Sequence, residues 1–218
     1  MKKDHTKIVA IVDKSGSMCG QEKTVVSGYN EFLSGHRTAE GTADITLVLF
    51  NTTNTIVYQD ADVTDVQELT EGDYVTGGLT ALLDALGGRI DAVGAAIDKL
   101  DDDQKPEQVI FFIMTDGAEN RSTEYNLEQV REKIKHQDEK YGWTFLFLGA
   151  GPEAFDGGLS LGIAPQFVAH TSNDAAGHKA AYGTVADISS GLRSRALSKS
   201  AVNVQNAYDS KKSTGSGC

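Results

Sequence analysis

The stretch "IVAIVDKSGSM", residues 8–18, joins a buried-strand pattern to a cluster of oxygen-bearing side chains. Its first five residues are apolar and mostly β-branched, which is typical of a strand that is covered on both faces. Asp13, Ser15 and Ser17 follow directly, at alternate positions. Because alternate residues of an extended segment point to the same side, these side chains can be directed toward one point. The stretch therefore predicts a central strand that ends at a candidate ligand site.

Strand and helix patterns alternate along most of the chain. The apolar periodicity predicts strands over residues 6–12, 43–51, 55–59, 108–115, 143–149 and 166–170. It predicts helices over residues 22–36, 62–69, 79–100, 126–141, 153–161 and 174–197. We expect a three-layer α/β/α sandwich around a doubly wound, mostly parallel sheet. The short spacing between the second and third strands predicts one antiparallel strand at the sheet edge.

The length of 218 residues suits one α/β domain with a full core. We expect this domain over residues 1–197, followed by a flexible tail over residues 198–218 that ends in "SKKSTGSGC". Two cysteines are too few for a disulfide framework. Cys19 is expected near a helix start, and Cys218 lies in the tail, where a cross-link between chains is one alternative.

The formal net charge of −11 comes from 31 acidic and 20 basic residues. This balance argues against nucleic acid as the main partner, because phosphate contacts need clustered Lys and Arg. Asp13 interrupts the first apolar run before it reaches the length of a secretory signal, and no apolar run approaches the length of a membrane span. We therefore expect a cytoplasmic protein without a membrane span.

Oxygen side chains also lie at two other positions expected at the same edge of the sheet. Asp116 follows a predicted strand in "IMTDGAEN", and Thr80 lies at the start of the long helix in "VTGGLTALLDA". Ligands of such sheets bind outside the carboxyl ends of the strands. Oxygen ligands without nearby His or Cys suit Mg²⁺ or Mn²⁺, with Ca²⁺ as an alternative. The candidate metal ligands are Asp13, Ser15, Ser17, Thr80 and Asp116.

In these residues the sequence resembles the von Willebrand factor type A (VWA) domains, over about residues 6–197. "DKSGS" fits the D-x-S-x-S pattern of that family's metal-ion-dependent adhesion site (MIDAS), "GGLTALLDA" supplies its threonine, and "MTDGAEN" its later aspartate. The resemblance implies a complete site in which Ser15, Ser17 and, with ligand bound, Thr80 contact the metal. Asp13 and Asp116 would act largely through water, and an acidic residue of a partner protein would complete the coordination.

We therefore expect a protein-binding module that is metal-dependent and not an enzyme. The resemblance suggests an AAA+ ATPase or an assembly component as the partner. The alternatives are a metal-dependent phosphohydrolase of similar architecture, or a structural protein, for example of a virion, that uses the fold as a scaffold. Lys14 and Ser15 follow Asp13 where phosphoaspartyl enzymes place a second acidic residue, and no His or Glu is marked as a general base.

Weaker patterns have simpler interpretations. Asp13, Ser15 and Thr80 could cap helices without binding a metal. "LGAGPEAF", residues 148–155, matches a dinucleotide-binding fingerprint, but its place late in the chain favours a plain strand-to-helix turn. Glu119 and Asn120 follow Asp116 and could rim the site or help to hold a loop, but we expect a plain solvated loop. The five histidines show no metal-ligand spacing, and we expect most of them at the surface.

Overall fold

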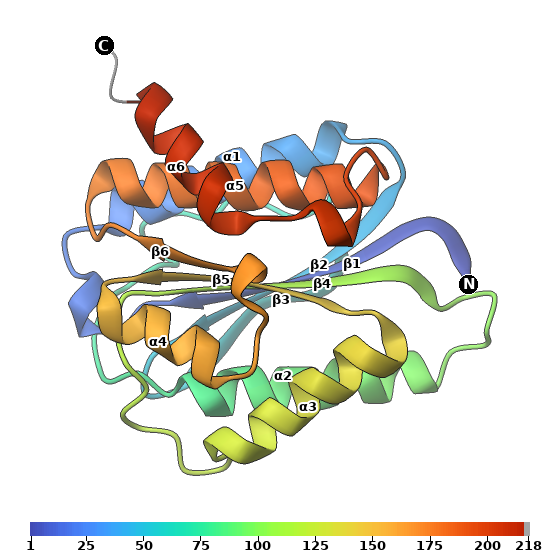
Figure 1. The fold of residues 1–218 in the computed structure, drawn as a ribbon, viewed down its shortest axis with the longest axis horizontal. Coiled ribbons are helices and arrows are strands. Elements are labelled where there is room, and N and C mark those ends of the chain that lie inside the picture. Colours follow the sequence, from blue (N-terminus) through green and yellow to red (C-terminus); the bar gives the residue numbers. More distant parts are fainter. Residues whose placement is uncertain (216–218) are drawn as a thin grey trace.

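The computed structural model describes residues 1–215 and contains one six-stranded sheet between two layers of helices (Figure 1). The strands lie in the order β3-β2-β1-β4-β5-β6. Their bounds are β1 (Lys2–Asp13), β2 (Thr42–Phe50), β3 (Asn54–Asp62), β4 (Pro106–Thr115), β5 (Thr144–Ala150) and β6 (Val168–Thr171). All neighbouring strands are parallel except β3, which pairs antiparallel with β2 at the edge. The predicted sandwich, with its antiparallel edge strand, is confirmed.

Helices cover both faces of the sheet (Figure 1). On one face lie α1 (Glu22–Thr38), α5 (Ala175–Arg193) and α6 (Val204–Gly215). On the other lie α2 (Leu82–Asp98), α3 (Leu127–Tyr141) and α4 (Pro152–Ser160). The central strands β1 and β4 are buried on both sides, which explains their continuous apolar sequences. Within the described residues, no helix is both long and apolar enough to cross a bilayer.

The helix expected over residues 62–69 is absent: in the described chain, Asp62 ends β3 and residues 63–69 form turns and irregular loop. Val63, Val66 and Leu69 are buried there, so the segment packs on the core without helical hydrogen bonds. Side chains of α1 form hydrogen bonds with the backbone of this segment instead. Asn30 bonds both the N–H and the C=O of Leu69, and Arg37 donates to the carbonyls of Val63 and Val66. Tertiary partners outside the segment therefore override its helical pattern.

The expectation of a flexible tail is wrong for most of residues 198–215. The 3₁₀ helix η3 (Lys199–Ala201) and helix α6 follow the predicted end of the domain. Val202, Val204 and Tyr208 are buried, with at most 3% exposure, and α6 packs against α5 and β6. The sequence expectation overlooked these spaced apolar residues among polar ones. Cys218, for which a cross-link was considered, lies outside the described residues, and the domain boundary at residue 197 stays a prediction.

Candidate metal site at the carboxyl ends of the strands

The register of the sheet brings the ends of β1 and β4 together. Val12 pairs with Met114, so Asp13 and Thr115 emerge side by side at the carboxyl ends of the two central strands. Backbone hydrogen bonds then tie the segment after β1 to its neighbours. Lys14 N–H donates to Phe50 O at 2.7 Å, and Gly16 N–H donates to Gly78 O at 3.0 Å. The segment after β1 is therefore held between β2 and the loop that carries Thr80.

Asp13 is fully buried, and both of its carboxylate oxygens accept hydrogen bonds. Ser15 N–H donates to Oδ1 at 2.7 Å, and the Thr115 hydroxyl donates to Oδ2 at 2.6 Å. Burial raises the pKa of Asp13 to about 6, although these hydrogen bonds act in the opposite direction. Tyr74 also donates its hydroxyl to the Asp13 carbonyl. Asp13 is thus a rigidly held carboxylate that a bound cation would stabilise in its charged form.

A chain of hydrogen bonds joins three of the predicted ligands. The Ser15 and Ser17 hydroxyl oxygens lie 3.1 Å apart, and the Ser17 hydroxyl donates to Asp116 Oδ1 at 2.6 Å. Ser15 is buried, Ser17 is exposed, and Asp116 is half-buried. This series of hydrogen bonds therefore begins in the interior and reaches the surface. The structure therefore brings together oxygen atoms from two segments that are about 100 residues apart in sequence.

Thr80 reaches the same place through a loop that only glycine can form. Gly77 and Gly78 have φ of +148° and +79°, and a Cβ on Gly78 would lie 2.7 Å from the Thr52 hydroxyl. Thr80 is buried, and a methyl group on Gly117 would lie 3.2 Å from Thr80 Oγ1 and 3.6 Å from Ser17 Oγ. The Thr80 and Ser17 hydroxyls thus border the same glycine beside Asp116. All five predicted residues converge.

Glu119 and Asn120 hold the loop after β4, one of the two roles considered for them. Asn120 Oδ1 accepts from Thr80 N–H at 2.9 Å, and Asn120 N–H donates to Thr80 O at 3.0 Å. Glu119 accepts from Leu83 N–H in the first turn of α2 and from both the N–H and the hydroxyl of Ser122. These bonds fix Thr80 relative to the loop that begins at Asp116.

Several residues that support the site carried weak sequence signals. Thr115 and Asn173 lie at or just after strand ends, so the strand-end rule could have found them. Asn173 Nδ2 donates to Asp116 Oδ2 at 2.9 Å, and Asn173 Oδ1 lies 2.9 Å from His178 Nε2. The expectation that most histidines lie at the surface is wrong, because His5, His36 and His178 are buried. No periodic pattern marked His178 as a contact of the site.

The donor set fits a small, hard cation. Among the described residues, no three His, Cys, Asp or Glu side chains form a group able to hold a metal, so binding here has to use the hydroxyls. Adjacent ligands of an octahedral Mg²⁺ at 2.0–2.1 Å lie about 3 Å apart. The Ser15 and Ser17 oxygens, at 3.1 Å, have this spacing. Two carboxylates and three hydroxyls leave room for a further ligand from outside the chain.

The fold is that of solved VWA domains. One similar structure is mussel byssus proximal thread matrix protein 1 (PTMP1) with a zinc-occupied MIDAS motif (TM-score 0.60, 14% identity, 85% of this chain, 46% of that chain). Another is von Willebrand factor type A from Catenulispora acidiphila (TM-score 0.55, 18% identity, 86% of this chain, 43% of that chain). A third is manganese-loaded Plasmodium vivax TRAP protein (TM-score 0.54, 15% identity, 79% of this chain, 70% of that chain).

These likenesses show the fold. The chain spans less than half the length of the PTMP1 and Catenulispora structures. No family model and no curated protein sequence matches this chain.

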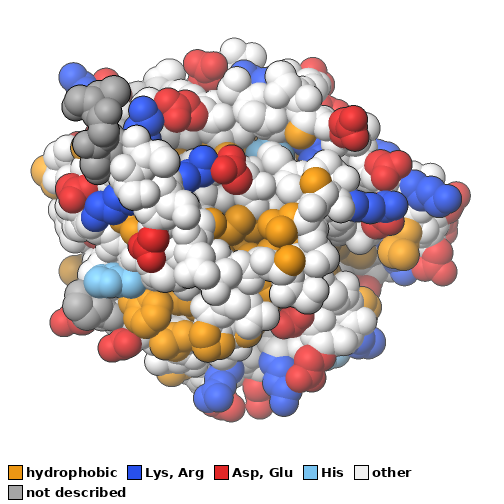
Figure 2. Space-filling model, turned by 45° about the horizontal axis from the view of Figure 1, so that its top comes forward, with side chains coloured by type: hydrophobic (Ala, Val, Ile, Leu, Met, Phe, Trp, Pro, Cys, Tyr) orange, Lys and Arg blue, Asp and Glu red, His pale blue; other side chains and the backbone are white. Residues whose placement is uncertain are grey.

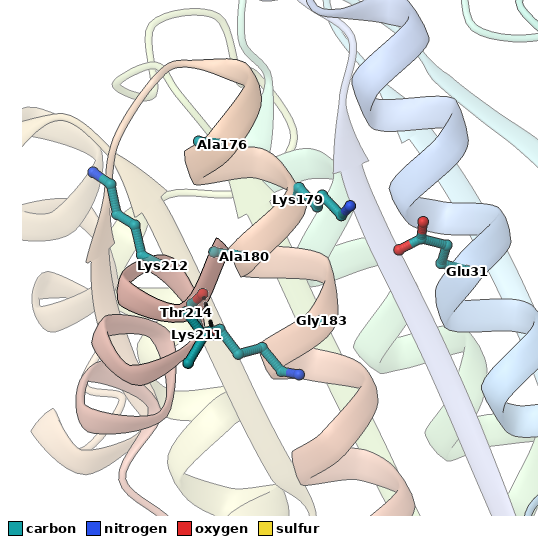
Figure 3. Close-up of a pocket in the computed structure, with 8 residues that line it drawn as sticks. All are labelled: Glu31, Ala176, Lys179, Ala180, Gly183, Lys211, Lys212 and Thr214. Carbon is teal, nitrogen blue, oxygen red and sulfur yellow. Dashed lines mark hydrogen bonds between the residues drawn. The ribbon is translucent and has the colours of Figure 1, made fainter. Parts of the chain in front are cut away.

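Away from the strand-end cluster, a concave surface of about 300 Å³ lies between α1, α5 and α6 (Figure 3). Lys179 of α5 and Glu31 of α1 point toward each other across it. Lys211 lies against Gly183 and pairs with Asp187 at 2.8 Å. Basic and acidic side chains are interspersed over the face of the molecule that Figure 2 shows. Because both signs of charge meet in this groove, its chemistry points to no one class of ligand, and the strand-end cluster is the better candidate site.

Proposed function

We propose that this chain is a metal-dependent protein-binding module. Asp13, Ser15, Ser17, Thr80 and Asp116 hold Mg²⁺ or Mn²⁺, with Ca²⁺ as an alternative. The cation supplies positive charge at the surface, where it attracts a Glu or Asp of a partner protein. The observation that carries the proposal is the continuous contact from Ser15 through Ser17 to Asp116. Zinc in the PTMP1 motif and manganese in the TRAP structure support a divalent cation.

The surroundings of Asp13 favour binding over hydrolysis. A phosphoaspartyl mechanism needs a carboxylate that a phosphate can reach, but Asp13 is fully buried and both its oxygens are hydrogen-bonded. The exposed oxygens of the cluster belong to Ser17 and Asp116 instead. The proposal includes a cytoplasmic location and an AAA+ ATPase or an assembly component as partner, for which the support is the sequence resemblance.

The metal part of the proposal is tested by calorimetric titration with Mg²⁺ and Mn²⁺. Wild-type protein should bind one ion, and Asp13→Ala and Thr80→Val should each weaken binding at least tenfold. Thr144→Val is the matched control, because Thr144 is equally buried but lies in β5. Bound Mn²⁺ should also raise the unfolding temperature, because it binds the folded state selectively. Equal affinity in wild type and both site variants would refute the assignment.

The partner part of the proposal needs a separate experiment. Immobilised wild-type protein should retain partners from a lysate in Mn²⁺ and release them when EDTA is added. A synthetic ligand that carries the acidic side chain gives a direct comparison, because its Glu→Gln form should lose the metal-dependent binding. Capture that is insensitive to EDTA and to Thr80→Val would show that partners use another surface.

A further inference from the structure

Asp116 has a second hydrogen-bond partner, which comes from the segment between β6 and α5. We propose that Asn173 is a positioning residue for Asp116, and that His178 fixes the orientation of Asn173. The inference rests on the proposed function. The D-x-S-x-S, threonine and aspartate pattern includes neither residue, and both come from the segment around the start of α5.

The two oxygens of Asp116 are held from different parts of the chain. Oδ1 accepts from the Ser17 hydroxyl at 2.6 Å, and Oδ2 accepts from Asn173 Nδ2 at 2.9 Å. Asn173 lies between β6 and α5, directly before Asp174, which caps α5 by accepting from Gly177 N–H at 2.7 Å. With one contact on each oxygen, the Asp116 carboxylate can no longer rotate freely about its own axis.

The direction of each hydrogen bond in this chain is set by chemistry. A carboxylate oxygen accepts, so the Asn173 amide has to present its NH₂ group to Asp116. Its carbonyl oxygen then faces His178 Nε2 at 2.9 Å and can only accept. His178 must therefore carry its proton on Nε2. The opposite orientation of the amide would place its oxygen against the carboxylate, where both atoms are acceptors. Each atom in this series of hydrogen bonds therefore acts either as a donor or as an acceptor in only one consistent arrangement.

His178 is needed because Asn173 is exposed and His178 is not. An exposed amide competes with water for its partners and samples several rotamers, which weakens its hold on a carboxylate. His178 is only 4% exposed and lines a small pocket together with Thr115 and Tyr182. This packing fixes the ring, and the ring fixes the amide. Outer-shell partners that hold the groups around a metal typically change its affinity 10–100-fold.

The effects of the His178 ring position and of metal binding on each other are reciprocal. If the position of the His178 ring favours metal binding through Asn173, metal binding has to favour that position of the ring by the same factor. His178 lies in the first turn of α5. Backbone amides around Gly177 and His178 should accordingly exchange more slowly with deuterium when Mn²⁺ is bound.

The test compares variants by calorimetric Mn²⁺ titration of the full chain. Asn173→Ala should bind at least tenfold more weakly than wild type, and the control Asn206→Ala, an exposed asparagine of α6, should bind equally well. His178→Leu should weaken binding, whereas His178→Gln, which can place an N–H near the Nε2 position, should retain it. A merely structural role for His178 would not favour Gln over Leu in a buried site. Equal binding by Asn173→Ala and wild type would overturn the inference.

A measurement without metal separates this inference from the proposed function. Nitrogen NMR of the metal-free protein should show His178 protonated on Nε2, and that signal should shift in Asn173→Ala. A proton on Nδ1 would overturn the inference whatever the metal does. Weak binding by Asp13→Ala together with normal binding by Asn173→Ala would leave the metal site standing and remove only the role of Asn173. Wild type that binds no divalent ion would overturn both.

Discussion

Thr115 Oγ1 donates to Asp13 Oδ2 at 2.6 Å, and both residues are buried at the ends of neighbouring central strands. The hydroxyl therefore stabilises a carboxylate that water does not reach. Thr115→Val keeps the shape of the side chain and removes this donor. We expect the variant to lose about 1–3 kcal/mol of unfolding free energy, because a buried acceptor is left unpaired. We also expect weaker Mn²⁺ binding.

Urea unfolding and calorimetry measure the two effects of Thr115→Val. Thr144→Val makes the same change at another buried strand position and should leave Mn²⁺ binding unchanged. If both valine variants bind Mn²⁺ like wild type, the hydrogen bond from Thr115 does not orient Asp13 for a metal.

Gly117 offers a test of whether the Thr80 and Ser17 hydroxyls act together. A methyl group in Gly117→Ala would lie 3.2 Å from Thr80 Oγ1, closer than an ordinary contact, and 3.6 Å from Ser17 Oγ. We expect several-fold weaker Mn²⁺ binding with little change in stability. Gly157→Ala is the control, because a methyl group there meets no atom within 4 Å. Undiminished binding by Gly117→Ala would place the ion elsewhere.

The buried His36 predicts a loss of stability in mild acid. Burial, and secondarily the nearby Arg193, lower the pKa of His36 to about 3. The unfolded chain, with an ordinary pKa near 6.5, binds the proton first, so the free energy of unfolding falls as the pH drops below about 6.5. This loss continues toward pH 3, with a maximal slope of about 1.4 kcal/mol per pH unit.

Urea unfolding of wild type and His36→Gln at about pH 7 and pH 5 isolates this contribution. Gln can still donate to the Ser189 hydroxyl, which His36 Nε2 contacts at 2.8 Å, but it does not titrate. Wild type should lose on the order of 1–2 kcal/mol more than the variant over this interval. Asp13, whose raised pKa of about 6 acts in the opposite direction, is present in both proteins and cancels. The exposed His136→Gln should behave like wild type, and an identical loss in His36→Gln would contradict the assignment.

The docking of α6 can be tested with one charge placed at two neighbouring positions. Val204 is fully buried, whereas Asn206 is exposed on the same helix. Val204→Asp should detach α6 and cost several kcal/mol, because it buries an unpaired charge. Asn206→Asp adds the same charge and should stay within about 0.5 kcal/mol of wild type. Similar stability of the two variants would show that the helix does not dock in solution.

The fold was largely predictable from sequence because its strands are continuous apolar runs and its main helices are amphipathic. The segment around Val63 and Val66 was not predictable, since its backbone partners are side chains of α1. Helix α6 was missed for a similar reason. Its buried face consists of a few apolar residues among polar ones, so the pattern resembles a solvated tail.

The candidate site also has a part that could be predicted from the sequence and a part that could not. Asp13, Ser15 and Ser17 were identified because their spacing is local and they follow an obvious strand. Their convergence with Thr80 and Asp116 depends on the order of β1 and β4, which the strand-end rule anticipates. The contacts of Asn173 and His178 depend on rotamers and on how closely α5 approaches the sheet. These properties leave no periodic trace in a single sequence.

Helix α6 also has a consequence for how this protein meets copies of itself. Strand β6 lies at the open side of the sheet, where unpaired backbone groups invite another strand to join. Gln205 accepts from His170 N–H at 2.7 Å, and the Tyr208 hydroxyl accepts from Ser172 N–H at 2.9 Å. Two side chains thus occupy positions that a foreign strand would need. We therefore expect chains shortened before α6 to associate with one another through the edge of β6.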